Sequence, residues 1–347
     1  MFLLLLPTAI AGYGDVDDQD HPNWEDRALH MYTNMARVDP AAFKDEYKAG
    51  GCNFDKDFSQ EEKTPKTAYF YSRPLNKVAR LHSKDMNQTG ELDHTSSDGT
   101  SFGERVSAVY SEGAIGENIA WNYGLWGSVF QGWMCSTSGH RENLMSPLYV
   151  ELGTGVAGAY TTQNFGAGSP DTSGRIAMGL HEPENPKPGN EVTFWVDYQG
   201  KSGAELVLWL DGVDYTMARV YGEEDSGIWS TEVAMPESDA GCSAYYFSWE
   251  QGSNAGVFPQ DGSYLMGKDC KDLWVDAQYE EPTDPDEPDP NDGDPDPDPN
   301  DSEDDPRIGD GNGPNAEQPG GCSTLPAGSA GVVWLLALGG LLLRRRD

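Results

Sequence analysis

Basic side chains are scarce in this sequence of 347 residues, which has 23 Lys and Arg against 58 Asp and Glu. The formal net charge of -35 at pH 7 would be repelled by a phosphate backbone and by an anionic lipid surface. This charge balance excludes nucleic-acid binding, and it leaves contact with a membrane to the C-terminal segment alone.

Long hydrophobic runs are also missing, because neither end of the chain reaches the roughly 20 apolar residues that a membrane-spanning helix needs. The N-terminal run, 2–6, precedes the small residues of 8–11, a pattern typical of the end of a secretory signal peptide. We therefore predict a signal peptide over 1–12. Its usual basic start is absent, so translation is expected to begin upstream.

Only five cysteines are present, and no two have the C-x-x-C spacing of a zinc or redox site. An exported chain enters an oxidising compartment, so structural disulfides are expected. The simplest pairing keeps each bridge within one domain and joins Cys52 to Cys135 and Cys242 to Cys270. Four cysteines allow three pairings, and sequence alone does not decide between them.

The first domain, predicted over 13–168, has the pattern of an α+β unit. Apolar residues at steps of three and four indicate amphipathic helices, and residues of β type around Gly and Thr then indicate a hairpin. Helices followed by strands are typical of α+β folds. The predicted helices cover 23–38, 72–90, 102–109 and 125–134, and the hairpin covers 149–165.

A second domain, predicted over 169–277, consists of short β-rich runs. The predicted strands lie within 192–196, 205–210, 213–220, 228–235 and 244–249, and Asp211-Gly212 is a turn signal between two of them. This pattern favours an all-β sandwich of immunoglobulin or fibronectin type. A small barrel would fit nearly as well.

The remaining chain is predicted to be a linker followed by a C-terminal sorting or anchoring segment. Segment 278–321 is rich in Asp-Pro steps and is expected to be a disordered, self-repelling linker. In 322–347, Cys322 precedes an apolar run, 330–343, and three arginines. This tail resembles the C-terminal sorting tags of myxobacterial surface proteins, which implies export, processing near Cys322 and surface display. The alternative is an ordinary C-terminal membrane anchor with a hydrophobic helix.

Three stretches of sequence contain the candidate metal-binding and catalytic residues. They read LDHTSSDGTSFGERVSAVY from residue 92, IGENIAWNYG from residue 115 and GWMCSTSGHRENLM from residue 132. His94, Glu117 and His140 lie beside predicted turns or helix ends, where side chains can converge. Two imidazoles and a carboxylate are a plausible ligand set for a divalent cation of the zinc class. From spacing alone, three unrelated surface or cap residues would be the more frequent explanation.

The same strings, with TTQNFG at 161–166, resemble the bacterial branch of the CAP superfamily, also called the SCP or pathogenesis-related fold. The resemblance covers about 23–168 and implies an α-β-α sandwich whose central cleft is formed by His94, Glu117 and His140. A second cleft glutamate of many eukaryotic members corresponds here to Ser136. The histidine also comes one residue later than expected, so Ser136 or Ser138 could occupy its place. These departures imply a weak site, or one in which water completes the coordination of the ion.

Other polar and aromatic residues in the strings are assigned structural roles. Asn118, Arg105 and Asn143 are expected to satisfy backbone groups beside turns. Trp121, Trp126 and Trp133 are expected in the core. A Ser-His hydrolase built on Ser136 or Ser138 with His140 is disfavoured, because neither serine lies in a G-x-S-x-G motif and a serine near a helix start is commonly a cap.

The sequence therefore predicts an exported, surface-displayed binding protein. Its ligand would be a divalent cation, a lipid-like molecule, another cell-envelope component or a surface protein. One alternative is a metal-assisted hydrolase acting on peptides, with Glu117 as general base. The other is an adhesion module that acts through the β-domain.

Overall fold

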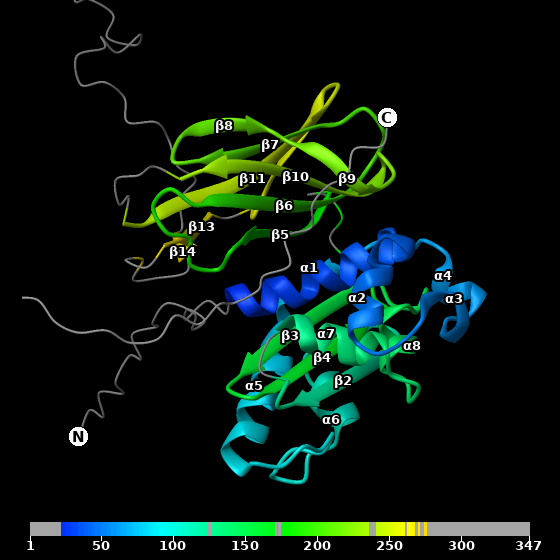
Figure 1. The fold of residues 1–347 in the computed structure, drawn as a ribbon. Coiled ribbons are helices and arrows are strands. Elements are labelled where there is room, and N and C mark those ends of the chain that lie inside the picture. Colours follow the sequence, from blue (N-terminus) through cyan, green and yellow to red (C-terminus); the bar gives the residue numbers. More distant parts are fainter. Residues whose placement is uncertain are drawn as a thin grey trace, which may run out of the picture. The chain divides into compact units, whose positions relative to one another are not determined.

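The computed structural model describes residues 22–123, 126–170, 172, 175–235, 241–260, 262–267, 270 and 274–275 (Figure 1). We call 22–170 the α+β half and 175–275 the β-rich half. The predicted signal peptide, the linker and the tail with Cys322 lie outside the described residues. Among the residues that are described, no helix has the length and apolar character needed to cross a membrane.

The four predicted helices of the α+β half form as α1, α5, α6 and α7, whereas η1, α2, α3, α4 and α8 were not predicted. Asn23 caps α1, because its side-chain oxygen accepts from the Asp26 backbone N–H at 2.8 Å. The longest helix, α5, has Pro74 in its first turn and ends at Gly90, whose φ of 78° is left-handed. The helices are α1 (Trp24–Val38), η1 (Pro40–Phe43), α2 (Lys44–Ala49), α3 (Phe54–Asp57), α4 (Gln60–Lys63), α5 (Arg73–Thr89), α6 (Phe102–Ser107), α7 (Trp126–Met134) and α8 (His140–Leu144).

One sheet completes the α+β half, with strand order β1-β3-β4-β2. Its strands are β1 (Phe70–Tyr71), β2 (Ile115–Trp121), β3 (Glu151–Ala157) and β4 (Tyr160–Gly166). The hairpin β3-β4 confirms the prediction, whereas β2 was not predicted. Helix α5 packs against β3 at Gly153 and Gly155, where an added Cβ would lie 2.0 Å and 2.1 Å from helix backbone nitrogens. Glycine is therefore required for this close contact.

The β-rich half is a sandwich of two sheets, ordered β5-β6-β10-β9 and β14-β13-β11-β7-β8, with β12 paired to β11. Apolar side chains from both sheets fill the space between them. At the predicted turn, Asp211 and Gly212 have φ of 50° and 81°, as a type I′ hairpin requires. The strands are β5 (Ile176–Glu182), β6 (Glu191–Gln199), β7 (Glu205–Leu210), β8 (Val213–Thr216), β9 (Ala218–Gly222), β10 (Ser226–Ala234), β11 (Ser243–Gln251), β12 (Asn254–Phe258), β13 (Ser263–Met266) and β14 (Trp274–Val275).

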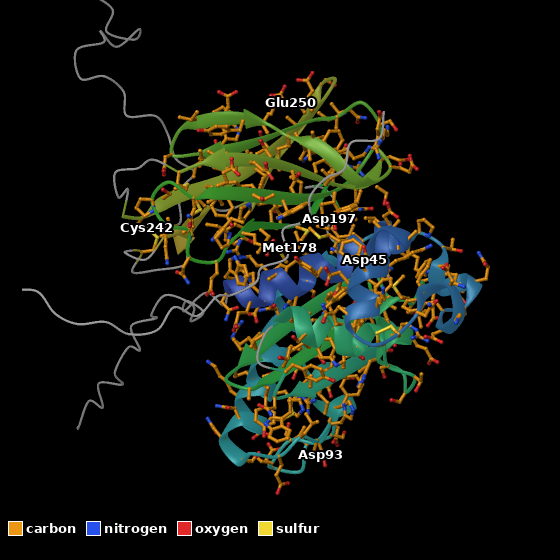
Figure 2. All side chains as sticks on the ribbon, viewed as in Figure 1. Asp45, Asp93, Met178, Asp197, Cys242 and Glu250 are labelled. Atoms are coloured by element: carbon orange, nitrogen blue, oxygen red, sulfur yellow. A yellow bond between two sulfur atoms is a disulfide. The ribbon has the colours of Figure 1, made fainter. Side chains whose placement is uncertain are left out.

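Helix α1 is buried between the two halves. On one side, Trp24 Nε1 donates to the His181 carbonyl at 2.6 Å, and Arg27 donates to the Tyr245 hydroxyl at 2.6 Å. On the other side, Asp26 accepts from the backbone N–H of Val156 in β3 at 2.9 Å. One hydrophobic core consequently includes side chains of α1, of the α+β sheet and of β5 (Figure 2). The sequence boundary near residue 169 does not divide this core.

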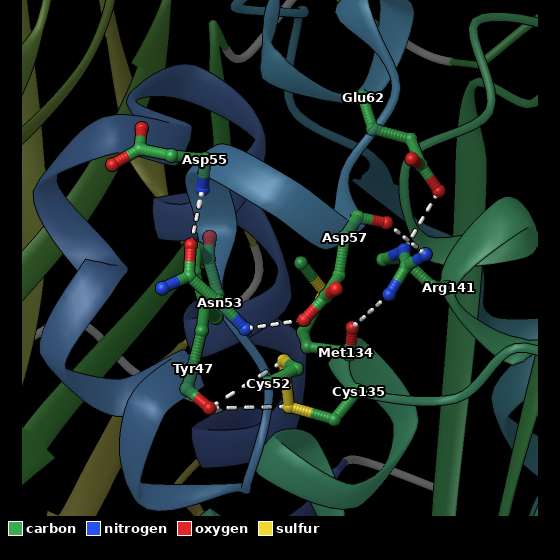
Figure 3. Close-up of a disulfide and its surroundings, with 9 residues drawn as sticks. All are labelled: Tyr47, Cys52, Asn53, Asp55, Asp57, Glu62, Met134, Cys135 and Arg141. Carbon is green, nitrogen blue, oxygen red and sulfur yellow. Dashed lines mark hydrogen bonds and ion pairs between the residues drawn. A yellow bond between two sulfur atoms is a disulfide. The ribbon is translucent and has the colours of Figure 1, made fainter.

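Both expected disulfides form, Cys52 with Cys135 and Cys242 with Cys270. The first joins the end of the α2 region to the end of α7 (Figure 3). Each bridge lies within one half of the described chain, as the simplest pairing predicted.

Candidate functional site

The loop between α5 and α6 holds His94 beside the sheet. Two contacts fasten this loop to α5: the Ser97 backbone N–H donates to Asp85 at 2.8 Å, and a His82 ring nitrogen lies 2.9 Å from the Asp93 carbonyl oxygen. The loop is therefore anchored on both sides of His94.

Glu117, in the middle of β2, is the centre of the site. Its side chain is 1% exposed. One carboxylate oxygen lies 2.8 Å from His94 Nδ1, and the other accepts from Arg105 Nη2 at 2.6 Å. With its amide nitrogen turned toward the carboxylate, Asn164 of β4 donates to the second oxygen at 3.0 Å. The buried charge is thus compensated by three neighbours.

Arg105 has a larger role than the sequence indicated. Besides Glu117, it donates to the His94 carbonyl at 3.2 Å and to Ser96 Oγ at 2.9 Å. It therefore fixes the loop that carries His94 as well as the carboxylate. A signal for this role was present, because a buried glutamate needs a cationic partner and Arg105 lies in the neighbouring motif.

His140 is the first residue of α8, and its backbone lies beside the middle of β2. Asn118 donates to its carbonyl at 3.2 Å, and Asn143 donates to Asn118 Oδ1 at 2.9 Å. Asn143 also donates to the Glu117 carbonyl at 3.3 Å, so the expected backbone role of both asparagines is confirmed. The next residue, Arg141, donates to Glu62 at 2.7 Å and anchors α8 (Figure 3).

The two imidazoles have opposite pKa shifts. The hydrogen bond to Glu117 raises the pKa of His94. Burial, and then the nearby charge of His94, lower the pKa of His140. There is consequently a pH range in which His94 is protonated while His140 is neutral. We call His94, Glu117, Arg105 and His140 the Glu117 cluster.

The cluster does not assemble the predicted three-residue ligand set. Within the described ranges, no group of three or more His, Cys, Asp or Glu side chains is arranged to hold a metal ion. Both oxygens of Glu117 are already engaged, one with His94 and the other with Arg105. The expected substitute, Ser136, lies 3.2 Å from Ser138 through their hydroxyl oxygens. Metal binding itself stays a prediction.

The predicted tryptophan positions are only partly correct. Trp133 is 1% exposed and is a core residue as expected. Trp121 is 52% exposed, so its assignment to the core is wrong. The reason is its position as the last residue of β2, which is an edge strand. The side chain of Trp126 lies outside the described residues.

Residues 32–167 match the family model of the cysteine-rich secretory protein family, CAP. The chain therefore contains a CAP domain, as its motifs predicted. The match includes every residue of the Glu117 cluster.

A curated relative, the uncharacterized membrane protein YlbC of Bacillus subtilis (strain 168), is 35% identical over 96 residues. The match covers 27% of this chain and 28% of that protein. Among solved structures, an extracellular SCP-domain protein of Bacillus anthracis str. Ames is 33% identical, with 29% of this chain and 34% of that chain covered and a TM-score of 0.28. An outer surface protein of Borrelia burgdorferi is 19% identical, with 37% and 96% covered and a TM-score of 0.28.

Proposed function

We propose that this CAP-domain protein is exported to the cell surface and acts as a binding protein, with the Glu117 cluster as its binding site. Its two disulfides support export, because such bridges persist in oxidising compartments. The apolar N-terminal run supports the same location, and the Bacillus subtilis relative is named a membrane protein. A lipid-like molecule, another envelope component or a surface protein stays the proposed natural partner.

The contact between His94 and Glu117 carries the proposal for the site. When His94 Nδ1 donates to the buried carboxylate, the lone pair of the neutral ring is on Nε2. The His94 side chain is 55% exposed, so this nitrogen is available to a ligand. A carboxylate that orients a histidine in this way is the usual support of a metal-binding imidazole. Glu117 then orients His94 instead of binding the ion.

His140 supplies the second imidazole. Its lowered pKa keeps the ring neutral at neutral pH, which is the form that binds a metal ion. Two imidazoles, with water in the other positions, make an open and exchangeable site for a zinc-class cation. His94 has a raised pKa, so protons compete for it at higher pH than for an ordinary histidine.

Calorimetric titration of the full chain with ZnCl₂ at neutral pH tests this site. We expect reversible binding that weakens as the pH is lowered through the raised pKa of His94. His94→Ala and His140→Ala should each abolish the heat, and Glu91→Gln, an exposed acidic residue beside the loop, should leave it unchanged. No heat in the wild type, or heat in the two histidine variants equal to that of the wild type, would contradict the proposal.

Hydrolysis is less well supported by the geometry than binding. Both oxygens of Glu117 already take part in hydrogen bonds, with Arg105 and with His94, so the carboxylate is engaged in holding these two side chains. The hydroxyls of Ser136 and Ser138 face each other instead of a histidine ring. The arrangement therefore favours binding.

A further inference from the structure

Among the described residues, the strand positions on the outer face of the six-stranded sheet, along β7, β8 and β11, are exposed or half-buried. The sheet β5-β6-β10-β9 has α1 on one face and the other sheet on its opposite face. Along β7, Leu206, Leu208 and Leu210 are buried toward the sandwich core, whereas Val207 and Trp209 alternate to the outside and are half-buried. Glu250 of β11 lies on the same sheet, away from α1 (Figure 2). Packing against α1 therefore does not explain the aromatic residues on this face.

Two aromatic rings form a platform on this outer face. Trp209 of β7 and Tyr246 of β11 are directly opposite in the strand register. Their ring centroids are 5.9 Å apart with an angle of 6° between the planes. Trp209 Nε1 donates to Ser248 Oγ at 2.8 Å, which fixes the indole orientation. The platform is preformed, so a ligand would not have to order it.

The charged side chains around this platform are all acidic. Asp214 of β8 is opposite Trp209 in the register, and Glu205 and Glu250 are opposite each other at the far end of the β7-β11 pair. All three are exposed, and no Lys or Arg occupies an outward position on the described residues of β7, β8, β11 and β12. Anionic ligands such as acidic lipids, nucleic acids and acidic glycans would be repelled.

A cross-strand aromatic pair can also serve sheet stability alone. That role does not need carboxylates next to half-buried rings. A neutral sugar ring matches both features, because its C–H face can lie on an aromatic ring while its hydroxyls donate to carboxylates. The acidic rim and the fixed rings thus suit a neutral polysaccharide.

We propose that Trp209 and Tyr246 form a binding platform for a neutral polysaccharide, with Asp214 accepting hydrogen bonds from sugar hydroxyls. The β-rich half then attaches this surface protein to a glycan, independently of the Glu117 cluster. The platform lies on the outer face of a sheet, so it would take a polymer chain laid across the strands and not an enclosed small molecule.

Affinity electrophoresis of the full chain in gels containing a neutral glucan, a mannan or a soluble N-acetylated chitin derivative tests the proposal. We expect at least one of them to retard the protein. Trp209→Ala and Tyr246→Ala should each weaken binding by about tenfold or more, as loss of a central aromatic contact does. Tyr246→Phe keeps the ring and should still bind. Trp121→Ala removes an exposed tryptophan of the α+β half and should bind like the wild type.

A second variant separates binding from stability. Asp214→Lys changes an exposed residue and places an ammonium group next to the Trp209 ring, where it can cover the indole face. We expect normal thermal unfolding and loss of retardation. The proposal is overturned if the wild type is retarded by none of the three polysaccharides, or if Asp214→Lys and Trp209→Ala are retarded as much as the wild type.

Discussion

Truncation after Gly168 removes the β-rich half and should leave the α+β half unable to fold cooperatively. The large side chains that lose cover include Trp24, Val38 and Phe43, which are 3% to 6% exposed in the intact chain. Trp24 contacts His181, and the Phe43 ring centroid lies 5.3 Å from that of Tyr221. Exposing three such side chains costs at most about 5 to 9 kcal/mol. That loss is comparable to the whole stability of an ordinary domain, about 5 to 15 kcal/mol.

Thermal unfolding followed by circular dichroism provides the assay. The intact chain should unfold in one transition, and the truncated chain should lack a sharp transition. Leu180→Ala, in the core shared with α1, and Leu208→Ala, in the sandwich core, should each destabilise by about 2 to 5 kcal/mol and shift this same transition. A truncated chain that melts cooperatively near the temperature of the intact chain would refute the reasoning.

Three further predictions concern buried histidines, a disulfide and the tail. Burial lowers the pKa of His30 to about 4 and of His181 to about 3, so below pH 6.5 the unfolded chain binds protons that the folded chain refuses. Each histidine should then cost about 1.4 kcal/mol per pH unit, and urea unfolding at pH 7 and pH 5 should show a smaller loss for His181→Asn than for the wild type. Replacing Cys52 and Cys135 by Ser should cost about 2 to 5 kcal/mol in the same measurement, and an unchanged midpoint would contradict this. In cells, Cys322→Ala should leave the tail unprocessed, whereas normal surface display of that variant would exclude a processing role.

Elements with a regular pattern and a clear stop could be predicted from sequence. Helix α5 has its apolar stripe, Pro74 at the start and Gly90 at the end. Strand β2 could not be predicted in this way, because its buried residues include Glu117 and Asn118. Polar residues indicate a loop unless their partners are known, and here the partners come from α6, α8 and the loop that carries His94. Whether such residues are buried depends on tertiary contacts, which a local sequence pattern does not show.

The burial of α1 by both halves of the chain could not be predicted for the same reason. Arg27 and Asn34 occupy helix positions that an amphipathic pattern assigns to solvent. In the structure they are 2% and 0% exposed, because Arg27 donates to Tyr245 and Asn34 donates to the Tyr69 carbonyl. Of the three residues that the motifs selected, His94 lies 2.8 Å from the Glu117 carboxylate, and the charge of His94 lowers the pKa of His140. Only the fold shows that Arg105 is the group paired with the carboxylate.

This pairing determines which variant can test the site. Glu117→Ala would leave Arg105 buried without its charge partner, which typically costs about 3 to 5 kcal/mol. Lost binding in that variant would therefore follow from lost structure as readily as from a lost ligand. His94 is more than half exposed, and its replacement leaves the bond between Arg105 and Glu117 in place. Variants of His94 and His140, and not of Glu117, therefore separate ligand binding from folding.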